Sequence, residues 1–443
     1  MIRTRIAPSP TGYPHIGTIY QALFDWAYAH KHDGKFIVRI EDTDQTRLVA
    51  DAEEKIFSSL DWFELTEDES VRKGGPFEPY RQSERLELYN KYAKELVEKG
   101  VAYYCDCTPE RLKESRDQMQ KEGKNPMYDK HCRELKLQSS ELKTSGKPFV
   151  IRLKVPDNTT IVVIDGIRGE ISFESSSVDD QVLIKSDGFP TYHLAVVVDD
   201  HTMEITDVVR GEEWLTSTPK HWLLYDFFGW HKPNFYHTPV LRNPDKSKLS
   251  KRHGHTSVEW YKEAGFLPEA ILNFLALMGW SHPEEKEIFS IDEFIERFDL
   301  KDLKPVGPIF DLNKLTWMNG MYIRESQNSK LKTQILEFDP SLKEMDDQQL
   351  EKFLEIAKSR MKTLKEFRDL IDPFLNKREF ELTDEQKNQR TKLKEKLESI
   401  DDWHTENLVK ALKSFAESHD INFKEYYRML FNEKAGLPLA DAF

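Results

Sequence analysis

The sequence contains few cysteines and no long apolar segment. Its three cysteines among 443 residues are too few for a disulfide scaffold and predict a reducing compartment. The longest nearly apolar run, AILNFLALMGW (residues 270–280), is too short to span a bilayer and is interrupted by Asn273. The N-terminus lacks the apolar stretch of a secretory signal. These absences exclude a secreted disulfide-rich domain and a membrane bundle, and they predict a cytoplasmic protein without membrane contact.

Acidic residues outnumber basic residues over the whole chain. The net charge is −14, with 38% hydrophobic and 32% charged residues, as is typical of a globular protein with a polar surface. A negative sum does not exclude a nucleic-acid partner, because such binding depends on local basic patches. No internal repeat or low-complexity tract is present. The chain is too long for a single hydrophobic core and predicts about two to four domains.

Prolines and glycines are concentrated near the N-terminus, in PSPTGYPHIGT (residues 8–18). This loop follows a predicted strand at 2–7 and precedes a helix at 17–32 with one apolar face, after which 36–40 is a second predicted strand. Strand, glycine-bearing loop, helix and strand form the opening βαβ unit of a nucleotide-binding parallel sheet. A helix N-terminus favours phosphate through its N–H groups and dipole. We therefore expect His15 and Gly17 to contact a triphosphate.

Later segments predict further elements. We expect a helix at 84–99, strands in FVIRLKV, QVLIKS, LAVVVDD and ITDVVRG, and a helix in PKHWLLYDFFG. Beyond about residue 324 the chain is expected to be nearly all helical, with KSRMKTLKEFRDLI and DEQKNQRTKLKEKLESI as amphipathic helices rich in Lys and Arg. His221, His231 and His237 lie among aromatic residues and are interpreted as packing or surface residues rather than ligands.

A basic loop follows the last predicted strand, in RNPDKSKLSKRHGHTS (residues 242–257). Lys246, Lys248, Lys251 and Arg252 are close together among Ser, Asn and Gly residues. Such a loop can fold over a polyphosphate and neutralise the charge that develops in phosphoryl transfer.

Eight segments resemble, in order, the motifs of bacterial glutamyl-tRNA synthetases, which are class I enzymes: RIAPSPTG, FIVRIEDTD, PYRQSER, KSDGFPTYHLA, VVRGEEW, LRNPDKSKLSKR, GFLPEA and WMNG. The resemblance implies an α/β fold, in which a Rossmann-type parallel sheet carries an inserted acceptor-binding domain and is followed by a stem-contact domain and an all-helical anticodon-binding region. The implied boundaries are 1–100 and 186–240 for the catalytic halves, 101–185 for the insertion, 241–323 for the stem-contact domain with KLSKR, and 324–443 (324–375 and 376–443) for the anticodon-binding region.

The resemblance also implies the reaction. Members of this family activate L-glutamate with ATP to glutamyl-adenylate and transfer it to the 3′ end of glutamate tRNA, and catalysis rests on positioning and charge stabilisation. Catalytic roles are implied for His15, Gly17, Lys248 and Lys251. Mg²⁺ is expected to accompany ATP, although no dedicated motif for it is visible. The full implied ATP site is Pro8, Ser9, Pro10, Thr11, Gly12, His15, Gly17, Thr18, Glu213, Leu241, Lys248, Ser250 and Lys251.

A dicarboxylic amino acid needs a cation for its side chain and an anion for its ammonium group. Arg5 and Arg210 are each suited to offer a planar pair of donors to a carboxylate, and Glu41 is suited to the ammonium. Val196 departs from the family, many of whose members carry Asn at this position, so a polar contact near the substrate is missing or replaced. The implied glutamate site is Arg5, Ala7, Ser9, Glu41, Tyr192 and Arg210.

All three cysteines fall within one short segment, CDC…YDKHC. Thiolates bind Zn²⁺ well, and a structural site needs four ligands. Some bacterial members of the family carry zinc on a C-x-C…Y-x₃-C pattern, which Cys105, Cys107, Tyr128 and Cys132 match. His131 is an alternative fourth ligand that is chemically better, but its adjacency to Cys132 makes shared coordination awkward. We expect a structural zinc rather than a catalytic one.

The resemblance further implies a monomer whose partners are glutamate tRNA, L-glutamate and ATP. Arg360, in SRMKTL, matches a position at which members that discriminate between tRNAs read the end of the anticodon. The alternatives are a non-discriminating enzyme that also charges glutamine tRNA, a glutaminyl-type synthetase, and a tRNA-binding protein that has lost catalysis. Members of the family usually continue with another helix beyond the point where this chain ends in GLPLADAF.

Overall fold

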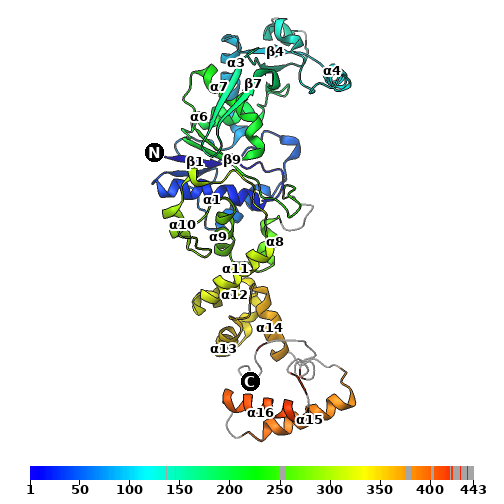
Figure 1. Cartoon of the computed structure of the whole chain (residues 1–443). Coiled ribbons are helices and arrows are strands. Elements are labelled where there is room, and N and C mark those ends of the chain that lie inside the picture. The colour runs from blue at the N-terminus through cyan, green and yellow to red at the C-terminus, as the bar shows by residue number, and fades with distance from the viewer. Residues whose placement is uncertain are drawn as a thin grey trace. The chain divides into compact units, whose positions relative to one another are not determined.

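The computed structural model describes residues 1–135, 137–144, 146–249, 256–375, 381–400, 404–419, 421–422, 430 and 437. The chain divides into two compact units, of which the first comprises 1–258 and 272–310 and the second 259–271 and 311–443 (Figure 1). None of the described helices combines the length and apolar composition that crossing a membrane requires. The five predicted domain boundaries stay a prediction.

The first unit opens with the predicted βαβ arrangement. β1 (Arg3–Ile6) and β2 (Lys35–Val38) are parallel, and α1 (Ile16–Lys31) connects them. β2 continues in parallel to the short β3 (Glu69–Ser70). Strand β1 is buried along its whole length, as expected for a central strand covered by helices. The predicted strands at 2–7 and 36–40 and the helix at 17–32 are thereby confirmed.

A second parallel pair lies beside β1. β9 (Asp207–Gly211) and β10 (Asn234–Thr238) are parallel and joined by α7 (Thr218–Phe228). The N–H of Thr206 donates to the carbonyl of Arg3 at 3.0 Å, which fixes the start of β9 beside the start of β1. The hairpin of β6 (Thr160–Asp165) and β7 (Gly169–Glu174) extends this sheet in the order β7-β6-β10-β9. The carboxyl ends of β1 and β9 therefore meet at one edge, where open α/β sheets bind ligands.

The segment between the two halves contains a separate antiparallel sheet in the order β4-β5-β8, from β4 (Ala102–Cys105), β5 (Val150–Leu153) and β8 (Val182–Ile184). The predicted strands in FVIRLKV and QVLIKS are confirmed. The remaining helices of the first unit are α2 (Ala52–Trp62), α3 (Leu86–Glu98), α4 (Pro109–Lys121), α5 (Ser139–Thr144) and α10 (Ile291–Arg297).

One predicted strand is wrong. LAVVVDD lies in a helix, α6 (Tyr192–Thr202), rather than in a strand. Its valines resemble a buried strand in sequence, because a short apolar β-branched run does not distinguish the two structures. In the fold the run is buried on several sides of the helix and packs in a large core cluster of the first unit, so tertiary packing outweighs the local β preference. Val196 is part of this core.

The described residues of the second unit form helices joined by turns and irregular connections, with no strand among them. Its central cluster buries Leu331, Leu354 and Phe367, and a smaller cluster joins α15 and α16 through Leu393 and Leu412. α8 and α9 are divided between the units by the boundaries given above. The helices are α8 (Val258–Glu263), α9 (Pro268–Gly279), α11 (Leu312–Glu325), α12 (Asn328–Phe338), α13 (Asp347–Ala357), α14 (Lys365–Leu375), α15 (Asp384–Glu398) and α16 (Thr405–His419).

The expected helix in KSRMKTLKEFRDLI begins later than predicted. α14 begins at Lys365, and residues 358–364 form the connection from α13. The N–H groups of Arg360 and Met361 both donate to the carbonyl of Ala357, which turns the chain at this point. Arg360 is therefore exposed in a turn and does not lie on a helical face.

Candidate active site

A cavity of about 640 Å³ opens at the carboxyl ends of β1 and β9. The strands contribute Arg5 and Arg210, and the loop after β2 contributes Glu41. All six residues of the implied glutamate site line this cavity: Arg5, Ala7, Ser9, Glu41, Tyr192 and Arg210. The structure thus brings together side chains that are far apart in sequence, while their roles stay a prediction. Val196 is absent from the described lining of the cavity, so its difference from the family lies in the core.

Arg5 is committed to an acidic partner. Its Nε and Nη2 atoms donate to the two carboxylate oxygens of Asp200 at 3.0 and 3.2 Å. Asp200 also accepts from Arg39 Nη1 at 2.9 Å, and all three side chains are nearly fully buried. Burial opposes ionisation of Asp200, but the two guanidinium groups outweigh it and hold its pKa below the usual range. This side of the cavity is an ion-pair network.

Glu41 joins that network at its edge. Its carboxylate accepts from Arg39 Nη2 at 3.2 Å and from Gln82 Nε2 at 3.3 Å. Burial raises the pKa of Glu41 to about 7, because desolvation outweighs the attraction of Arg39 and Arg5. A bound ammonium group would stabilise the ionised form of this carboxylate, because burial removes the water that would otherwise solvate its charge.

Arg210 also lines the cavity, but it has a different set of partners. Its Nε donates to His237 Nε2 at 2.9 Å, and its Nη1 donates to His221 Nδ1 at 3.0 Å and to the Tyr192 hydroxyl at 3.2 Å. Its Nη2 donates to Thr218 Oγ1 at 2.9 Å. Among the described residues, no carboxylate lies within ion-pair distance of Arg210. Of the two arginines that β1 and β9 contribute to the cavity, Arg5 is therefore paired with a carboxylate, whereas Arg210 has no carboxylate partner among the described residues.

A second cavity, of about 270 Å³, adjoins the first, and Gln21 and Trp214 line both. It receives six residues of the implied ATP site: His15, Gly17, Thr18, Glu213, Leu241 and Lys248. Ser250 and Lys251 of that site lie outside the described residues. Ser9 and Thr11 line the first cavity, whereas Pro8, Pro10 and Gly12 line neither among the described residues. The carbonyls of Pro8 and Pro10 accept from the N–H groups of Glu41 and Val49, so they hold neighbouring loops in place.

The start of α1 differs from the expectation of open N–H groups. His15 is the N-cap residue, and its Nδ1 accepts from the N–H of Gly17 at 2.9 Å. The N–H groups of Ile16 and Thr18 donate to the carbonyls of Thr256 and His15. These amides are therefore already used. In its neutral form, the His15 ring carries its proton on Nε2, since Nδ1 is the acceptor.

Lys248 and Glu213 form an ion pair at the wall of the second cavity, with Nζ and Oε1 2.8 Å apart. A Cβ atom on Gly211 would lie 2.1 Å from Glu213 Oε2 and 2.9 Å from Gln21 Nε2, so a side chain at position 211 would displace both. Because Gly211 has no side chain, Glu213 and Gln21 of the second cavity can pack closely against the end of β9, which also contributes Arg210 to the first cavity.

The sequence did not reveal several residues around these cavities. Asp200 is not predicted, because LAVVVDD resembles a strand in sequence, although two adjacent acids follow its apolar run. His221 and His237, which the sequence predicts as packing or surface residues, are buried and also contact Arg210. The further residues of the first cavity that the sequence does not predict are Ile6, Gln21, Thr43, Asp44, Arg47, Lys185, Pro190, Thr191, Val209 and Trp214.

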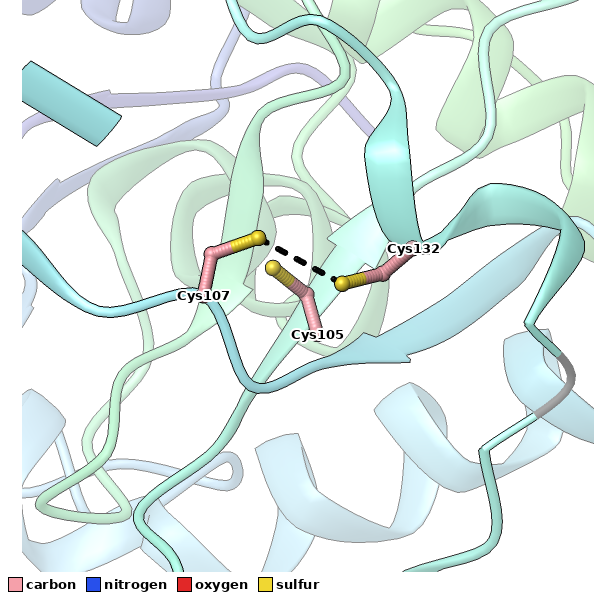
Figure 2. Close-up of side chains that lie close together, drawn as sticks. All are labelled: Cys105, Cys107 and Cys132. Atoms are coloured by element: carbon pink, nitrogen blue, oxygen red, sulfur yellow. Dashed lines mark hydrogen bonds between the residues drawn. The ribbon is translucent and has the colours of Figure 1, made fainter. Parts of the chain in front are cut away.

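The three cysteines lie together, with Cys105 in β4, Cys107 just after it and Cys132 in the short helix at 131–134 (Figure 2). All their sulfur atoms lie within 4.8 Å of one another, and Cys107 Sγ and Cys132 Sγ are 3.4 Å apart. The Tyr128 hydroxyl lies 3.4 Å from Cys105 Sγ and 3.5 Å from Cys107 Sγ. His131 is exposed and does not belong to the described ligand cluster.

Two arginines face this cluster. Arg152 Nε donates to Cys105 Sγ at 3.3 Å, and its guanidinium carbon lies 3.8 Å from the centre of the Tyr128 ring. Arg111 Nη1 donates to Cys107 Sγ at 3.5 Å. Cationic donors favour the thiolate over the thiol, and the thiolate is the form that binds a metal. The donor set of three sulfurs and one phenol oxygen fits a four-coordinate ion.

Comparison with known proteins agrees with this architecture. A model of the catalytic domain of class I tRNA synthetases (E and Q) matches residues 1–317, and an anticodon binding domain model matches residues 329–432. The chain is 47% identical over 448 residues to a glutamate–tRNA ligase of Psychrobacter sp. (strain PRwf-1), covering 98% of this chain and 87% of that protein. It is 52% identical over 373 residues to a glutamate–tRNA ligase of Thermus thermophilus, covering 83% of this chain and 78% of that protein.

Solved structures give the same result. The crystal structure of a glutamate tRNA ligase from Elizabethkingia meningosepticum CCUG26117, in complex with its amino acid, is similar with a TM-score of 0.87 at 34% identity, covering 100% of this chain and 96% of that chain. The fold and these matches define a class I tRNA synthetase catalytic domain followed by a mostly helical C-terminal region. Within that class, the chain belongs to the glutamate–tRNA ligase family.

Proposed function

We propose that the protein joins L-glutamate to the 3′ end of glutamate tRNA, with ATP as the energy source. The observation that supports glutamate as the substrate is the large cavity, which is lined both by Arg210, without a described carboxylate partner, and by the carboxylate of Glu41. A γ-carboxylate on Arg210 and an ammonium group on Glu41 satisfy both ends of a dicarboxylic amino acid. The α-carboxylate is then left to react.

The second cavity supplies the place for ATP. In the first step an oxygen of the glutamate α-carboxylate attacks the α-phosphorus, the bond to the bridging oxygen of the β-phosphate breaks, and pyrophosphate leaves. His15 and Lys248 provide donors at this cavity, where negative charge develops on the phosphates. In the second step a ribose hydroxyl of the terminal tRNA nucleotide attacks the carbonyl carbon, and AMP leaves.

Mg²⁺ is proposed to enter with ATP. In the described part of the chain, only the cysteine cluster brings three or more His, Cys, Asp or Glu ligands together. An ion carried on the phosphates needs few protein ligands, because Mg²⁺ commonly keeps several waters and binds through phosphate oxygens. It would add positive charge to the phosphates that His15 and Lys248 approach.

We also propose a structural Zn²⁺ on Cys105, Cys107, Cys132 and Tyr128. Support comes from the converging sulfurs and from the phenol oxygen beside two of them. Metal analysis of the purified protein is expected to give about one zinc per chain, and Cys132→Ser is expected to lose it together with thermal stability. A protein without zinc whose melting temperature is unaffected by this substitution would exclude the site.

The anticodon-binding role is proposed for the second unit, with Arg360 reading the anticodon. Its support is the exposed position of Arg360 in the turn before α14, within the segment that the anticodon-domain model matches. On this basis the enzyme discriminates against glutamine tRNA. We propose that the enzyme acts in translation, in the cytoplasm, and that it is a monomer.

The test is charging of purified tRNA with labelled glutamate, on glutamate tRNA and glutamine tRNA separately, with glutamine as control amino acid. We expect glutamate on glutamate tRNA alone. Arg360→Gln is expected to raise charging of glutamine tRNA relative to glutamate tRNA, whereas Arg324→Gln, an equal change of charge on an exposed residue of the same unit, leaves this ratio unchanged. Attachment of glutamine by the wild-type protein would instead establish a glutaminyl-type enzyme.

A further inference from the structure

The surroundings of Arg210 show how a buried cation is held without being neutralised. Arg210 is 5% exposed, and each of its three nitrogen atoms has an acceptor within the protein. Every one of these acceptors belongs to a group that is uncharged when it accepts: two imidazoles, a threonine hydroxyl and a tyrosine hydroxyl. A buried arginine is ordinarily paired with an acid. Here four of the five N–H groups of the guanidinium donate to neutral acceptors, and its charge is retained.

The two imidazoles are oriented to accept. Asp165 Oδ2 lies 2.6 Å from His237 Nδ1, which places the ring proton on that nitrogen and leaves Nε2 to accept from Arg210. His221 accepts through Nδ1, and its Nε2 is 2.9 Å from His193 Nδ1. The Asp165 carboxylate also accepts from three backbone N–H groups, at positions 167, 168 and 237. Each histidine next to Arg210 therefore has a partner on its far side.

Burial also keeps these rings neutral. Desolvation, together with the positive charge of Arg210, lowers the pKa of His221 well below its usual value. Desolvation likewise lowers the pKa of His237 to about 4, ahead of the opposing hydrogen bond from Asp165. Burial lowers the pKa of His193 to about 3. Neutral imidazole is the form that can accept a hydrogen bond from a guanidinium.

We propose that His221, His237 and Thr218 are positioning residues that set the selectivity of the pocket for an anionic side chain. They hold Arg210 in place through three hydrogen bonds to neutral acceptors, so that its charge and a remaining N–H group are reserved for the substrate carboxylate. An acid at the same place would satisfy those donors equally well, but it would lower the positive potential that distinguishes a carboxylate from an amide. This inference rests on the proposed function, because it takes glutamate as the occupant of the cavity.

The test compares substitutions of matched shape that differ only in charge. His221→Gln keeps a neutral acceptor, and His221→Glu introduces a carboxylate that Arg210 would hold ionised. The measurement is aminoacylation of glutamate tRNA, which gives the KM for glutamate, the KM for ATP and the inhibition constant of glutamine. We expect His221→Glu to have a glutamate KM at least about 10-fold above that of His221→Gln, with similar ATP KM values. The inhibition constant of glutamine is expected to change much less.

Thr218 offers a second pair at the first residue of α7, where Asp is well tolerated because of the helix dipole. Thr218→Asp is expected to raise the glutamate KM by at least about 10-fold over Thr218→Asn. Equal KM values within each pair would overturn the inference and assign these residues a packing role. If both acidic variants fail to fold while both neutral ones fold, the inference also fails, since pairing a buried arginine should not destabilise it. A wild-type protein that charges no glutamate would instead refute the proposed function itself.

Discussion

Two arginines that line one cavity have partners of opposite kinds. Arg5 shares the carboxylate of Asp200 with Arg39, and Glu41 accepts a hydrogen bond from Arg39 in the same network. Arg210 is surrounded by neutral acceptors, with no described acid within ion-pair distance. Arg5 and Arg210 are both buried and hydrogen-bonded at each of their three nitrogens, so the difference lies in the charge of their partners.

This difference separates stability from recognition. A guanidinium with a fixed carboxylate partner contributes to the scaffold, and its positive charge is already balanced within the protein. A guanidinium held only by neutral groups can exert its charge on a ligand. Arg5 therefore has the geometry of a structural residue that also lines the pocket, and the geometry of Arg210 supports its proposed role in binding the substrate side chain.

The largest effect is expected from breaking the ion-pair network around Arg5. Asp200→Asn removes the carboxylate that two buried guanidinium groups share, and it is expected to lower the free energy of unfolding by about 3–5 kcal/mol. Urea unfolding followed by tryptophan fluorescence measures this. Asp226→Asn, which removes a half-exposed acid paired with Lys232, is the control and should cost less than about 1 kcal/mol. A similar cost for both substitutions would contradict the structural role of the network.

The next largest effect is expected at Glu41, whose carboxylate lines the same cavity. Glu41→Gln is expected to raise the glutamate KM by about 10- to 100-fold, because the ammonium group loses a charged partner. In the wild type the pKa of about 7 for Glu41 means that the carboxyl becomes protonated as the pH falls. The glutamate KM should therefore rise below about pH 7 and level off above it, whereas Glu41→Gln should show no such rise. Equal pH profiles for the two proteins would remove Glu41 from the binding site.

The smallest effect concerns an acid that has neither kind of partner. Asp25 in α1 is fully buried, and neither of its carboxylate oxygens has a hydrogen-bond partner. Desolvation raises its pKa well above the usual value, so the folded protein holds it neutral. Its contribution to stability is complete below about pH 4 and declines as the pH rises toward its folded pKa.

Asp25→Asn removes this titration and is expected to raise the free energy of unfolding by about 1–2 kcal/mol at neutral pH, with little gain near pH 4. Thermal or urea unfolding at several pH values measures the difference. A gain that does not change with pH would show that the carboxyl is ionised in the folded protein.

Much of the fold could be predicted from the sequence because its signals are local. The PSPTGYPHIGT loop between a strand and an apolar-faced helix is sufficient to identify the first βαβ unit. Arg5 and Arg210 are predicted as site residues only through the family resemblance, and both line one cavity. The helix at LAVVVDD was not predictable in this way. Its burial in the core, rather than its own β-branched residues, determines its conformation.

The partners of the two arginines also escaped sequence reasoning. Asp200 is far from Arg5 in sequence, and His221 and His237 reach Arg210 only because α7 and β10 pack beside β9. A buried histidine among aromatic residues gives no sign in sequence of whether it is packing or holding a functional group. Which groups surround Arg210 is decided by how distant segments of the chain pack together, so the sequence does not show that its described partners include no acid.

The most direct test of the account is the preference for glutamate over glutamine when Arg210 loses its charge. The ratio of kcat/KM for glutamate to that for glutamine would be measured with glutamate tRNA, for the wild type and for Arg210→Gln. The account predicts a fall of about 100-fold in this ratio, since a charge-assisted hydrogen bond to the γ-carboxylate is lost. An unchanged ratio would contradict it, and would mean that another group in the cavity recognises the side chain.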